Sequence, residues 1–372
     1  MRCPFCYLLN DAPLSAINFY HISYHTFFRN IGLFSNGITM SSKEIQNEKA
    51  ASTVTKPTAP LPPELPFIPI GHPDTMMSKE SVRRAVEEFK VRPTDIVVAT
   101  FPKTGTTLVC WICHLLRTGG QPALDQIETL YEVVPWPTLS WDIGYDPNVD
   151  GSQFVPRVFK SHLRMASIYR GCKYIVTVRD PAKTALSFYN FFRSKQVPFA
   201  FEMDVSTFVT DTPFLQGREG RASIWDYYQE YHILRDCPSV LVLVYEDLVK
   251  HMPACIEMIA KFMDLSSEQI NSELISKVAS KSTKEFMAQH MSLFDEPYER
   301  AKRLGRAGDL SQLAPGAKIS VSTHPQQLNE AAKTLLATKW KETMEDPLGY
   351  ADYAAFANVF RERNLARFGV KF

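Results

Sequence analysis

The sequence predicts an α/β fold with a central parallel sheet that is flanked by helices. Short apolar runs rich in β-branched residues recur along the chain, and we expect strands at residues 95–100, 155–163, 173–178 and 240–244. Continuous apolar runs of this length are typical of strands that are buried on both faces. Helical segments alternate with them, and such alternation indicates parallel strands joined by crossover helices.

The expected helices follow from apolar periodicity and from signals at their ends. Ser78 has the character of an N-cap for the first of them, and Pro181 fits the first turn of another. Helices are expected at residues 78–89, 108–117, 182–192, 223–234, 251–263, 280–287, 325–345 and 350–368. Residues 131–154 and 193–221 are irregular and rich in aromatic residues, Pro and Gly, so loops are expected there.

Composition places the chain among globular proteins and excludes some partners. Of 372 residues, 45% are hydrophobic and 22% are charged, and the net charge is +1. This balance gives no electrostatic reason to expect nucleic acid or a membrane surface as a partner. No apolar run reaches the roughly 20 residues of a membrane helix. Seven cysteines without regular spacing indicate reduced thiols and a cytoplasmic protein, unless an N-terminal signal directs it elsewhere.

The first 60 residues differ from the rest of the chain. A polar stretch at residues 41–60 is typical of a linker, and residues 17–34 resemble a targeting peptide without its basic start and apolar core. Cys3 and Cys6 have redox spacing, but no strand precedes them. We therefore predict an N-terminal extension at residues 1–60, disordered or targeting, and one domain at residues 61–372.

The loop between the first strand and its helix has the features of an anion site. Backbone N–H groups at a helix N-terminus are free to bind, and the helix dipole favours negative charge there. Gly105 permits close approach of a ligand, and Lys103 adds a mobile positive charge. No Asp or Glu lies between Lys103 and Arg117. The spacing does not fit a Walker A loop, which needs a Gly-Lys-Ser/Thr run.

Charged side chains also follow two further strands. Lys160 and His162 are two residues apart, so they share one face of a strand. A neighbouring cation favours neutral imidazole, which can accept a proton, and His162 is therefore a candidate general base. Arg179 follows the strand at residues 173–178 and precedes a helix, which makes a second anion-facing corner.

These motifs together resemble the soluble sulfotransferases, which use 3′-phosphoadenosine 5′-phosphosulfate (PAPS). Residues 102–107, Pro-Lys-Thr-Gly-Thr-Thr, are similar to the family's 5′-phosphosulfate loop, and residues 160–163, Lys-Ser-His-Leu, are similar to its Lys-Thr-His-Leu element. The resemblance implies a three-layer, P-loop-like fold. It implies that His162 takes the acceptor proton, that Lys103 and Lys160 stabilise charge, and that the 5′-phosphate is held by Thr104, Gly105, Thr106 and Thr107.

The same resemblance implies which residues bind the 3′-phosphate and the adenine of the nucleotide. Residues 178–189 are similar to the family's 3′-phosphate site, with Arg179 and Ser187 as ligands. Residues 303–310 are similar to its closing loop, which implies that Arg303 and Gly305 also bind the 3′-phosphate. Elements similar to those near adenine contribute two further residues, Tyr245 and Ser282.

The chain departs from the family at three positions. Leu108 stands where a Trp stacks on adenine, Leu304 where a Lys is usual and Leu310 where a Trp is usual. The Leu108 and Leu304 changes make a nucleotide-binding protein without catalysis conceivable. A P-loop-type nucleotide kinase is a second alternative, against which the missing Walker A glycine and the Lys placement speak. The family's dimerisation motif is not cleanly present, so the oligomeric state stays open.

The acceptor side is predicted from composition alone. Aromatic residues in the two expected loops favour an apolar alcohol, such as a sterol or phenol, over a sugar chain. The expected activity is thus sulfuryl transfer from PAPS to a small hydroxyl acceptor. No metal is expected, because no acidic pair resembles a magnesium site.

Overall fold

The structure is a computed structural model. It describes residues 77–122, 124, 126–127, 129–149, 153–194, 198–218, 221–294 and 326–371. These residues all belong to one compact unit, Lys56–Phe372. The predicted extension at residues 1–60 lies outside the described residues, and its boundary stays a prediction.

The described strands form one parallel sheet, as the sequence predicts. The strands are β1 (Ile96–Ala99), β2 (Val158–Ser161), β3 (Lys173–Val178) and β4 (Val240–Val244). Their order is β2-β1-β3-β4, and each neighbouring pair is parallel. All carboxyl ends therefore lie at one edge, where Ala99 pairs with Ser161 and Val178 pairs with Val244.

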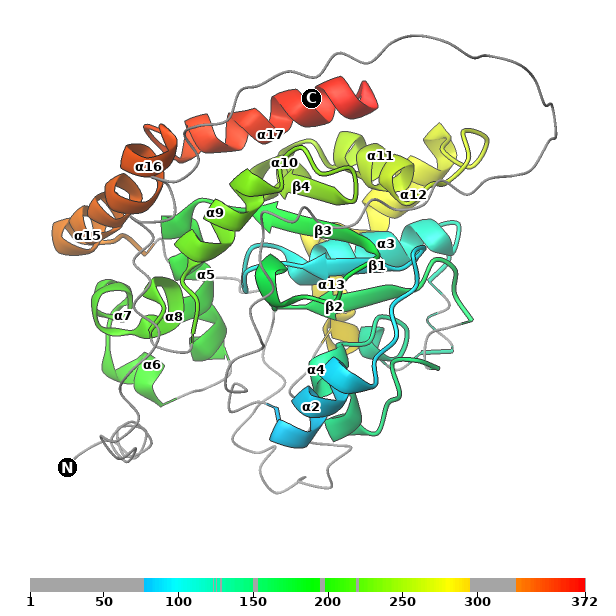
Figure 1. The fold of residues 1–372 in the computed structure, drawn as a ribbon, viewed down its shortest axis with the longest axis horizontal. Helices are drawn as coiled ribbons and strands as arrows, with labels where there is room; N and C mark the ends of the chain where they lie inside the picture. Colours follow the sequence, from blue (N-terminus) through cyan, green and yellow to red (C-terminus); the bar gives the residue numbers. More distant parts are fainter. Residues whose placement is uncertain are drawn as a thin grey trace, which may run out of the picture. The chain divides into compact units, whose positions relative to one another are not determined.

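Helices cover both faces of this sheet (Figure 1). Alternate residues of β1 enter different cores, with Val97 in one and Val98 in the other, because successive side chains of a strand point to opposite faces. The first core contains residues of α5 (Pro181–Ser194), α9 (Ile224–Ile233) and α17 (Tyr353–Phe368). The second contains residues of α3 (Thr106–Arg117), α11 (Met252–Phe262) and α12 (Ser272–Lys281). The predicted α/β class is confirmed.

Helix ends agree with the expected capping signals. The Ser78 hydroxyl accepts a hydrogen bond from the Ser81 N–H at 3.0 Å and begins α2 (Lys79–Glu87). Ser223 and Asp226 form a capping box at the start of α9. These caps satisfy N–H groups that have no partner within the helix.

The expectation of a loop at residues 193–221 is wrong. This segment contains α6 (Phe199–Glu202), α7 (Val205–Asp211) and α8 (Pro213–Gln216). The Asp204 carboxylate caps α7 by accepting from the Thr207 N–H at 2.8 Å. Phenylalanine rings from α5 to α8 pack on one another, with 4.5 Å between the centroids of Phe192 and Phe214. Burial of these rings orders turns that are too short to show helical periodicity.

Other boundaries also differ from those expected. Residues 131–154 contain the helical turns η3 (Leu130–Glu132), α4 (Pro137–Ser140) and η4 (Trp141–Ile143). The helix expected at residues 280–287 is divided, because α12 ends at Lys281 and α13 spans Lys284–Gln289. Near the C-terminus, α15 (Glu330–Trp340) continues as a π-helical turn, η8 (Lys341–Glu345), and α16 (Asp346–Leu348) follows.

The C-terminal helix α17 covers β4, which is an edge strand among the described strands. The Asn364 side chain donates to the Val242 carbonyl at 2.8 Å, and the Arg367 guanidinium donates to the Val240 carbonyl at 2.9 Å. Side chains of α17 thus bind carbonyl groups that an exposed edge would offer to another chain.

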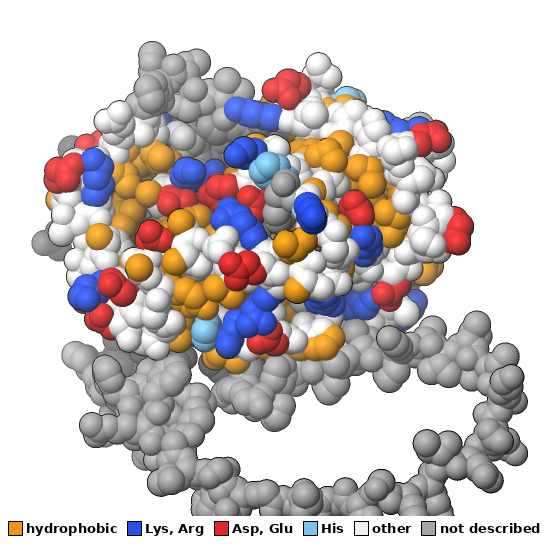
Figure 2. Space-filling view, turned by 90° about the horizontal axis from the view of Figure 1, so that it is seen from above, with side chains coloured by type: hydrophobic (Ala, Val, Ile, Leu, Met, Phe, Trp, Pro, Cys, Tyr) orange, Lys and Arg blue, Asp and Glu red, His pale blue; other side chains and the backbone are white. Residues whose placement is uncertain are grey.

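The distribution of charge can be followed on one face of the molecule. On the face drawn in Figure 2, acidic and basic side chains are interspersed, and neither gathers into a single patch. None of the helices in the described part of the chain combines the length and the apolarity that a membrane span requires.

Candidate functional site

The loop between β1 and α3 has the geometry of an anion site. Lys103 has φ 70° and Gly105 has φ 116°, and Gly105 begins α3 without a side-chain cap. The first N–H groups of α3 are therefore left for a ligand. Glycine is required here for two reasons. Its backbone conformation is rare for other residues, and a Cβ would lie 2.7 Å from Cδ2 of Tyr245.

The threonines of this loop divide into two groups. The Thr104 hydroxyl is buried, donates to the Phe101 carbonyl at 2.6 Å and lies 2.7 Å from the Thr177 hydroxyl of β3. The Thr106 hydroxyl lies 2.5 Å from that of Thr100. Both hydroxyls hold the loop to the sheet, whereas the Thr107 side chain is partly exposed. Of the three threonines that are predicted to bind phosphate, only Thr107 has a partly exposed side chain.

Lys103 joins this loop to the corner after β3. Its Nζ lies 4.1 Å from the centroid of the Phe191 ring of α5, which is a cation–π contact. Its backbone carbonyl accepts a hydrogen bond from Nη1 of Arg179 at 2.7 Å. The two basic corners that the sequence predicts are therefore in direct contact.

Arg179 is held from several directions. Its guanidinium carbon lies 4.1 Å above the centroid of the Tyr245 ring, which belongs to α10 (Tyr245–Lys250). Its backbone N–H donates to the Tyr228 hydroxyl at 3.0 Å, and this hydroxyl in turn donates to the Arg179 carbonyl. Burial raises the pKa of the Tyr228 hydroxyl, so it stays protonated and able to donate. The Nε of Arg179 is buried without a hydrogen-bond partner.

At the end of β2, Lys160 and His162 both contact the indole ring of Trp136, a partner that their spacing did not predict. Lys160 is buried, and its Nζ lies 4.0 Å from the centroid of Trp136, while the His162 ring lies 5.1 Å from the same residue. Nδ1 of His162 lies 2.9 Å from the Thr100 carbonyl. A carbonyl can only accept, so Nδ1 carries a proton, and in the neutral form of the ring Nε2 is the acceptor.

Lys103, His162 and Arg179 converge on one edge of the sheet. Thr100 follows β1 and links His162 to the anion loop, because its carbonyl accepts from His162 and its hydroxyl contacts Thr106. Lys103 is bonded to Arg179 through its carbonyl. The carboxyl edge of the parallel sheet thus carries basic side chains at an anion-binding loop, with the His162 imidazole beside them.

The remaining predicted residues lie apart from these contacts or outside the described residues. Ser187 lies on α5, with a partly exposed side chain. Ser282 ends α12, and its buried hydroxyl has no hydrogen-bond partner. Trp111 of α3 donates to the Lys281 carbonyl at 2.7 Å, which joins this helix end to α3. Arg303 and Gly305 lie outside the described residues. Among the described residues, no three His, Cys, Asp or Glu side chains are grouped as a metal site would require.

Sequence reasoning missed several side chains that support the site. Phe191 lies under Lys103, Tyr228 clamps the backbone of Arg179, and the Tyr227 hydroxyl donates to the His162 carbonyl at 2.6 Å. These residues are aromatic positions on amphipathic helices, where burial alone explains them. Their roles depend on contacts between distant segments, so no local motif marks them.

The sequence and the structure of the chain were compared with those of known proteins. Residues 93–310, more than half of the chain, match the model of the sulfotransferase domain. Sulfotransferase 2A6 from Rattus norvegicus is 28% identical over 221 residues, covering 58% of this chain and 74% of the relative. A 3-alpha-hydroxysteroid sulfotransferase from Cavia porcellus is 28% identical over 228 residues, with the same coverage. The structure of retinol dehydratase with retinol and PAP is 19% identical with a TM-score of 0.45, covering 80% of this chain and 89% of that chain.

Proposed function

Because the chain belongs to the sulfotransferase family, its activity is transfer of a sulfuryl group from PAPS to a hydroxyl acceptor, and we propose that this acceptor is an apolar alcohol such as a sterol. The convergence of His162 with the anion loop carries the mechanistic part of the proposal. Family membership disfavours the alternative of a nucleotide kinase.

The residues of the site suit a nucleotide with one phosphate at its 5′ position and another at its 3′ position. The N–H groups at the start of α3 suit the 5′-phosphate, and Gly105 keeps the approach open. Arg179 suits the 3′-phosphate, because its buried Nε has no hydrogen-bond partner within the protein. The buried hydroxyl of Ser282 is in the same condition and suits a polar group of the base. Ser187, Arg303 and Gly305 complete the proposed set through the family resemblance, with Tyr245 against Arg179.

The proposed chemistry uses residues on either side of the reacting group. PAPS supplies the sulfuryl group, with a phosphate as its leaving group. Nε2 of His162 accepts the proton of the acceptor hydroxyl, because Nδ1 is already bonded to the Thr100 carbonyl. Lys103 and Lys160 stabilise negative charge on the transferred group and on the leaving phosphate. The cation–π contacts with Phe191 and Trp136 hold the two ammonium groups in place.

The proposal of an apolar acceptor rests on the aromatic segments near this edge. Phe101 follows β1 and packs on Phe188 of α5, with 5.9 Å between the ring centroids, and on Tyr227 at 5.2 Å. Phe188 lies in turn 5.9 Å from Phe214 of α8. The rings of Phe101, Phe188 and Tyr227 are buried, so the interior next to His162 is apolar, and an apolar surrounding suits a hydrophobic ring system better than a sugar chain. The relative from Cavia porcellus, whose name specifies a hydroxysteroid, supports the same class.

Activity assays with labelled PAPS test the proposal at two levels. We expect turnover with sterols or phenols in a panel that also contains amines and oligosaccharides. Preference for an oligosaccharide would contradict the proposed acceptor class.

The role of His162 is tested by His162→Asn. The asparagine amide can donate to the Thr100 carbonyl in place of Nδ1, but it cannot take up a proton. We expect kcat to fall by roughly 10²–10⁴, the usual contribution of general base catalysis, with unchanged affinity for PAP by calorimetry. An unchanged kcat would remove His162 from the mechanism. Absence of turnover in wild type with every acceptor, despite PAP binding, would favour the non-catalytic alternative.

A further inference from the structure

The C-terminal helix α17 is tied to the start of α10 by polar side chains. The Arg361 guanidinium donates to both oxygens of Asp247, at 2.7 and 3.1 Å. Two turns earlier, the Tyr353 hydroxyl donates to Oε2 of Glu246 at 2.6 Å. Adjacent acidic residues of α10 are therefore both held by α17, which Figure 1 shows running beside α10 and β4.

Glu246 also forms a hydrogen bond with the backbone next to Arg179. Its other oxygen, Oε1, accepts from the backbone N–H of Asp180 at 3.2 Å. Asp180 directly follows Arg179 in the chain. A continuous series of hydrogen bonds thus runs from Tyr353 through Glu246 to the backbone beside Arg179.

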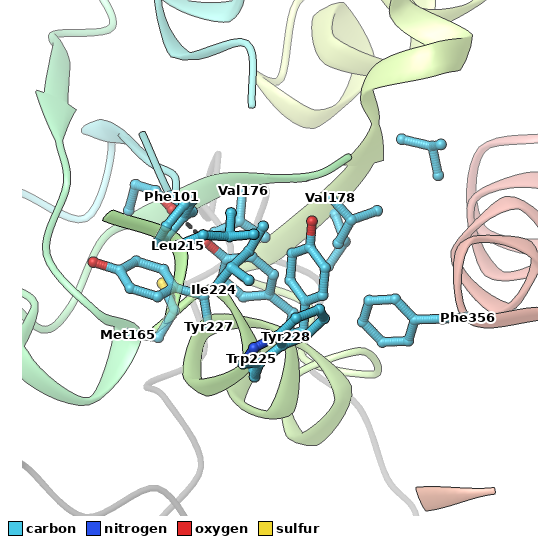
Figure 3. Close-up of a cluster of buried hydrophobic side chains, with 14 of the residues drawn as sticks. Phe101, Met165, Val176, Val178, Leu215, Ile224, Trp225, Tyr227, Tyr228 and Phe356 are labelled. Atoms are coloured by element: carbon cyan, nitrogen blue, oxygen red, sulfur yellow. Dashed lines mark hydrogen bonds between the residues drawn. The ribbon is translucent and has the colours of Figure 1, made fainter. Parts of the chain in front are cut away.

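The first turn of α10 also contacts the Arg179 guanidinium directly, through the Tyr245 ring. Tyr245 precedes Glu246, and its ring lies close to both Gly105 of the anion loop and the Arg179 guanidinium. A shift of the first turn of α10 would therefore move the ring on which this guanidinium rests. Packing supports the same arrangement, because Phe356 points from α17 towards Tyr228, with 5.2 Å between the ring centroids (Figure 3).

We propose that Tyr353 is a positioning residue for nucleotide binding, which fixes Glu246 so that Arg179 and Tyr245 keep their binding geometry. This inference rests on the proposed function, in which Arg179 binds the 3′-phosphate. In the part of the chain that the structure describes, the hydrogen bond of the Tyr353 hydroxyl goes to Glu246, which is not a proposed ligand residue. Burial raises the pKa of its hydroxyl, with the nearby Tyr228 and Glu246 adding to the effect, so the group donates at neutral pH.

The test is Tyr353→Phe, with Tyr350→Phe as the matched control. Each variant removes one hydroxyl from a ring of the C-terminal region, but the Tyr350 hydroxyl lies 2.7 Å from Nδ1 of His232 and does not contact α10. For Tyr353→Phe we expect PAP affinity by calorimetry to fall roughly fivefold, the equivalent of one hydrogen bond. KM for PAPS rises in parallel, while kcat and KM for the acceptor stay unchanged. For Tyr350→Phe we expect wild-type affinity.

Two results would overturn the inference. Equal PAP affinity in the two tyrosine variants is one. A lower melting temperature for Tyr353→Phe without loss of affinity is the other, because it would make the hydroxyl merely structural. Arg179→Gln separates this failure from that of the proposed function. If Arg179→Gln binds PAP normally, both ideas fail; if it binds weakly while Tyr353→Phe binds normally, only the inference fails.

Discussion

The two basic corners of the site are built in different ways. The corner after β1 takes its shape from a few neighbouring residues, through the backbone conformations of Lys103 and Gly105 and the contact between Thr100 and Thr106, and the Thr104 hydroxyl anchors it to β3. The corner after β3 depends on distant partners, since Arg179 is bonded to residues 49 and 76 positions away. A local corner depends on single residues with special backbone geometry, whereas an assembled corner depends on packing between helices.

The largest expected effect is that of Gly105→Ala, which tests the local corner. The new methyl group would meet the Tyr245 ring at 2.7 Å, in a backbone conformation that alanine rarely adopts. We expect the free energy of unfolding to fall by about 3 kcal/mol, from strain and overpacking together, and PAP affinity to fall at least about tenfold.

Gly119→Ala is the control for this change, because Gly119 lies just beyond the other end of α3. It also has a positive φ, 63°, but a Cβ there would meet nothing within 4 Å. We expect a smaller loss of stability and normal PAP binding. Chemical denaturation and calorimetry measure both variants, and equal effects would mean that contact with Tyr245 is unimportant.

An intermediate effect is expected for Tyr228→Phe, which tests the assembled corner. The variant keeps the ring but removes the hydroxyl that bonds both backbone groups of Arg179. Loss of a partner for buried polar groups costs about 2 kcal/mol of unfolding free energy. Denaturant titration measures this loss, and we expect PAP affinity to fall in parallel. If stability and affinity are both preserved, packing alone holds this corner.

The smallest expected effect is a loss of stability at low pH. It involves one histidine on each of two helices, α3 at the first corner and α9 at the second. Burial, followed by the charge of Arg117, lowers the pKa of His114 on α3 to about 3. Burial also lowers the pKa of His232 on α9 to about 4. Each folded-state pKa lies below the value of about 6.5 for an unfolded chain, so below pH 6.5 the unfolded state binds more protons and stability falls as the pH falls.

For His114 the decrease approaches about 1.4 kcal/mol per pH unit between pH 6.5 and the folded-state pKa. Urea titrations at pH 7.5 and 5.5 measure it. We expect His114→Gln and His232→Gln to reduce the pH dependence over this interval about equally, because both folded-state pKa values lie below pH 5.5. Identical pH dependence in wild type and His114→Gln would show that His114 does not titrate abnormally.

The difference between the corners also explains what the sequence could predict. The strands are evident because a strand buried on both faces needs a continuous apolar run, and Lys103, His162 and Arg179 follow such runs. Gly105 is evident because the loop needs its backbone freedom. The support of Arg179 by Tyr228 and Glu246 is not evident, because it depends on which distant helices meet.

The aromatic segments show a further limit of local reasoning. Residues 193–221 contain helices of only four to seven residues, which carry too few positions for periodicity to appear. The Asp204 cap was a usable signal for α7. The contact of both Lys160 and His162 with Trp136 could be expected only in part, since the strand spacing places the pair on one face but does not supply the ring.

The cover of β4 by α17 has a consequence for the order in which the protein is completed. Strand β4 leaves the ribosome more than a hundred residues before Asn364 and Arg367 are added. Until then, the carbonyl groups of Val240 and Val242 have only water or a foreign chain as partners. This border of the nascent sheet therefore stays open while residues 245–364 are synthesised, and α17 then covers it.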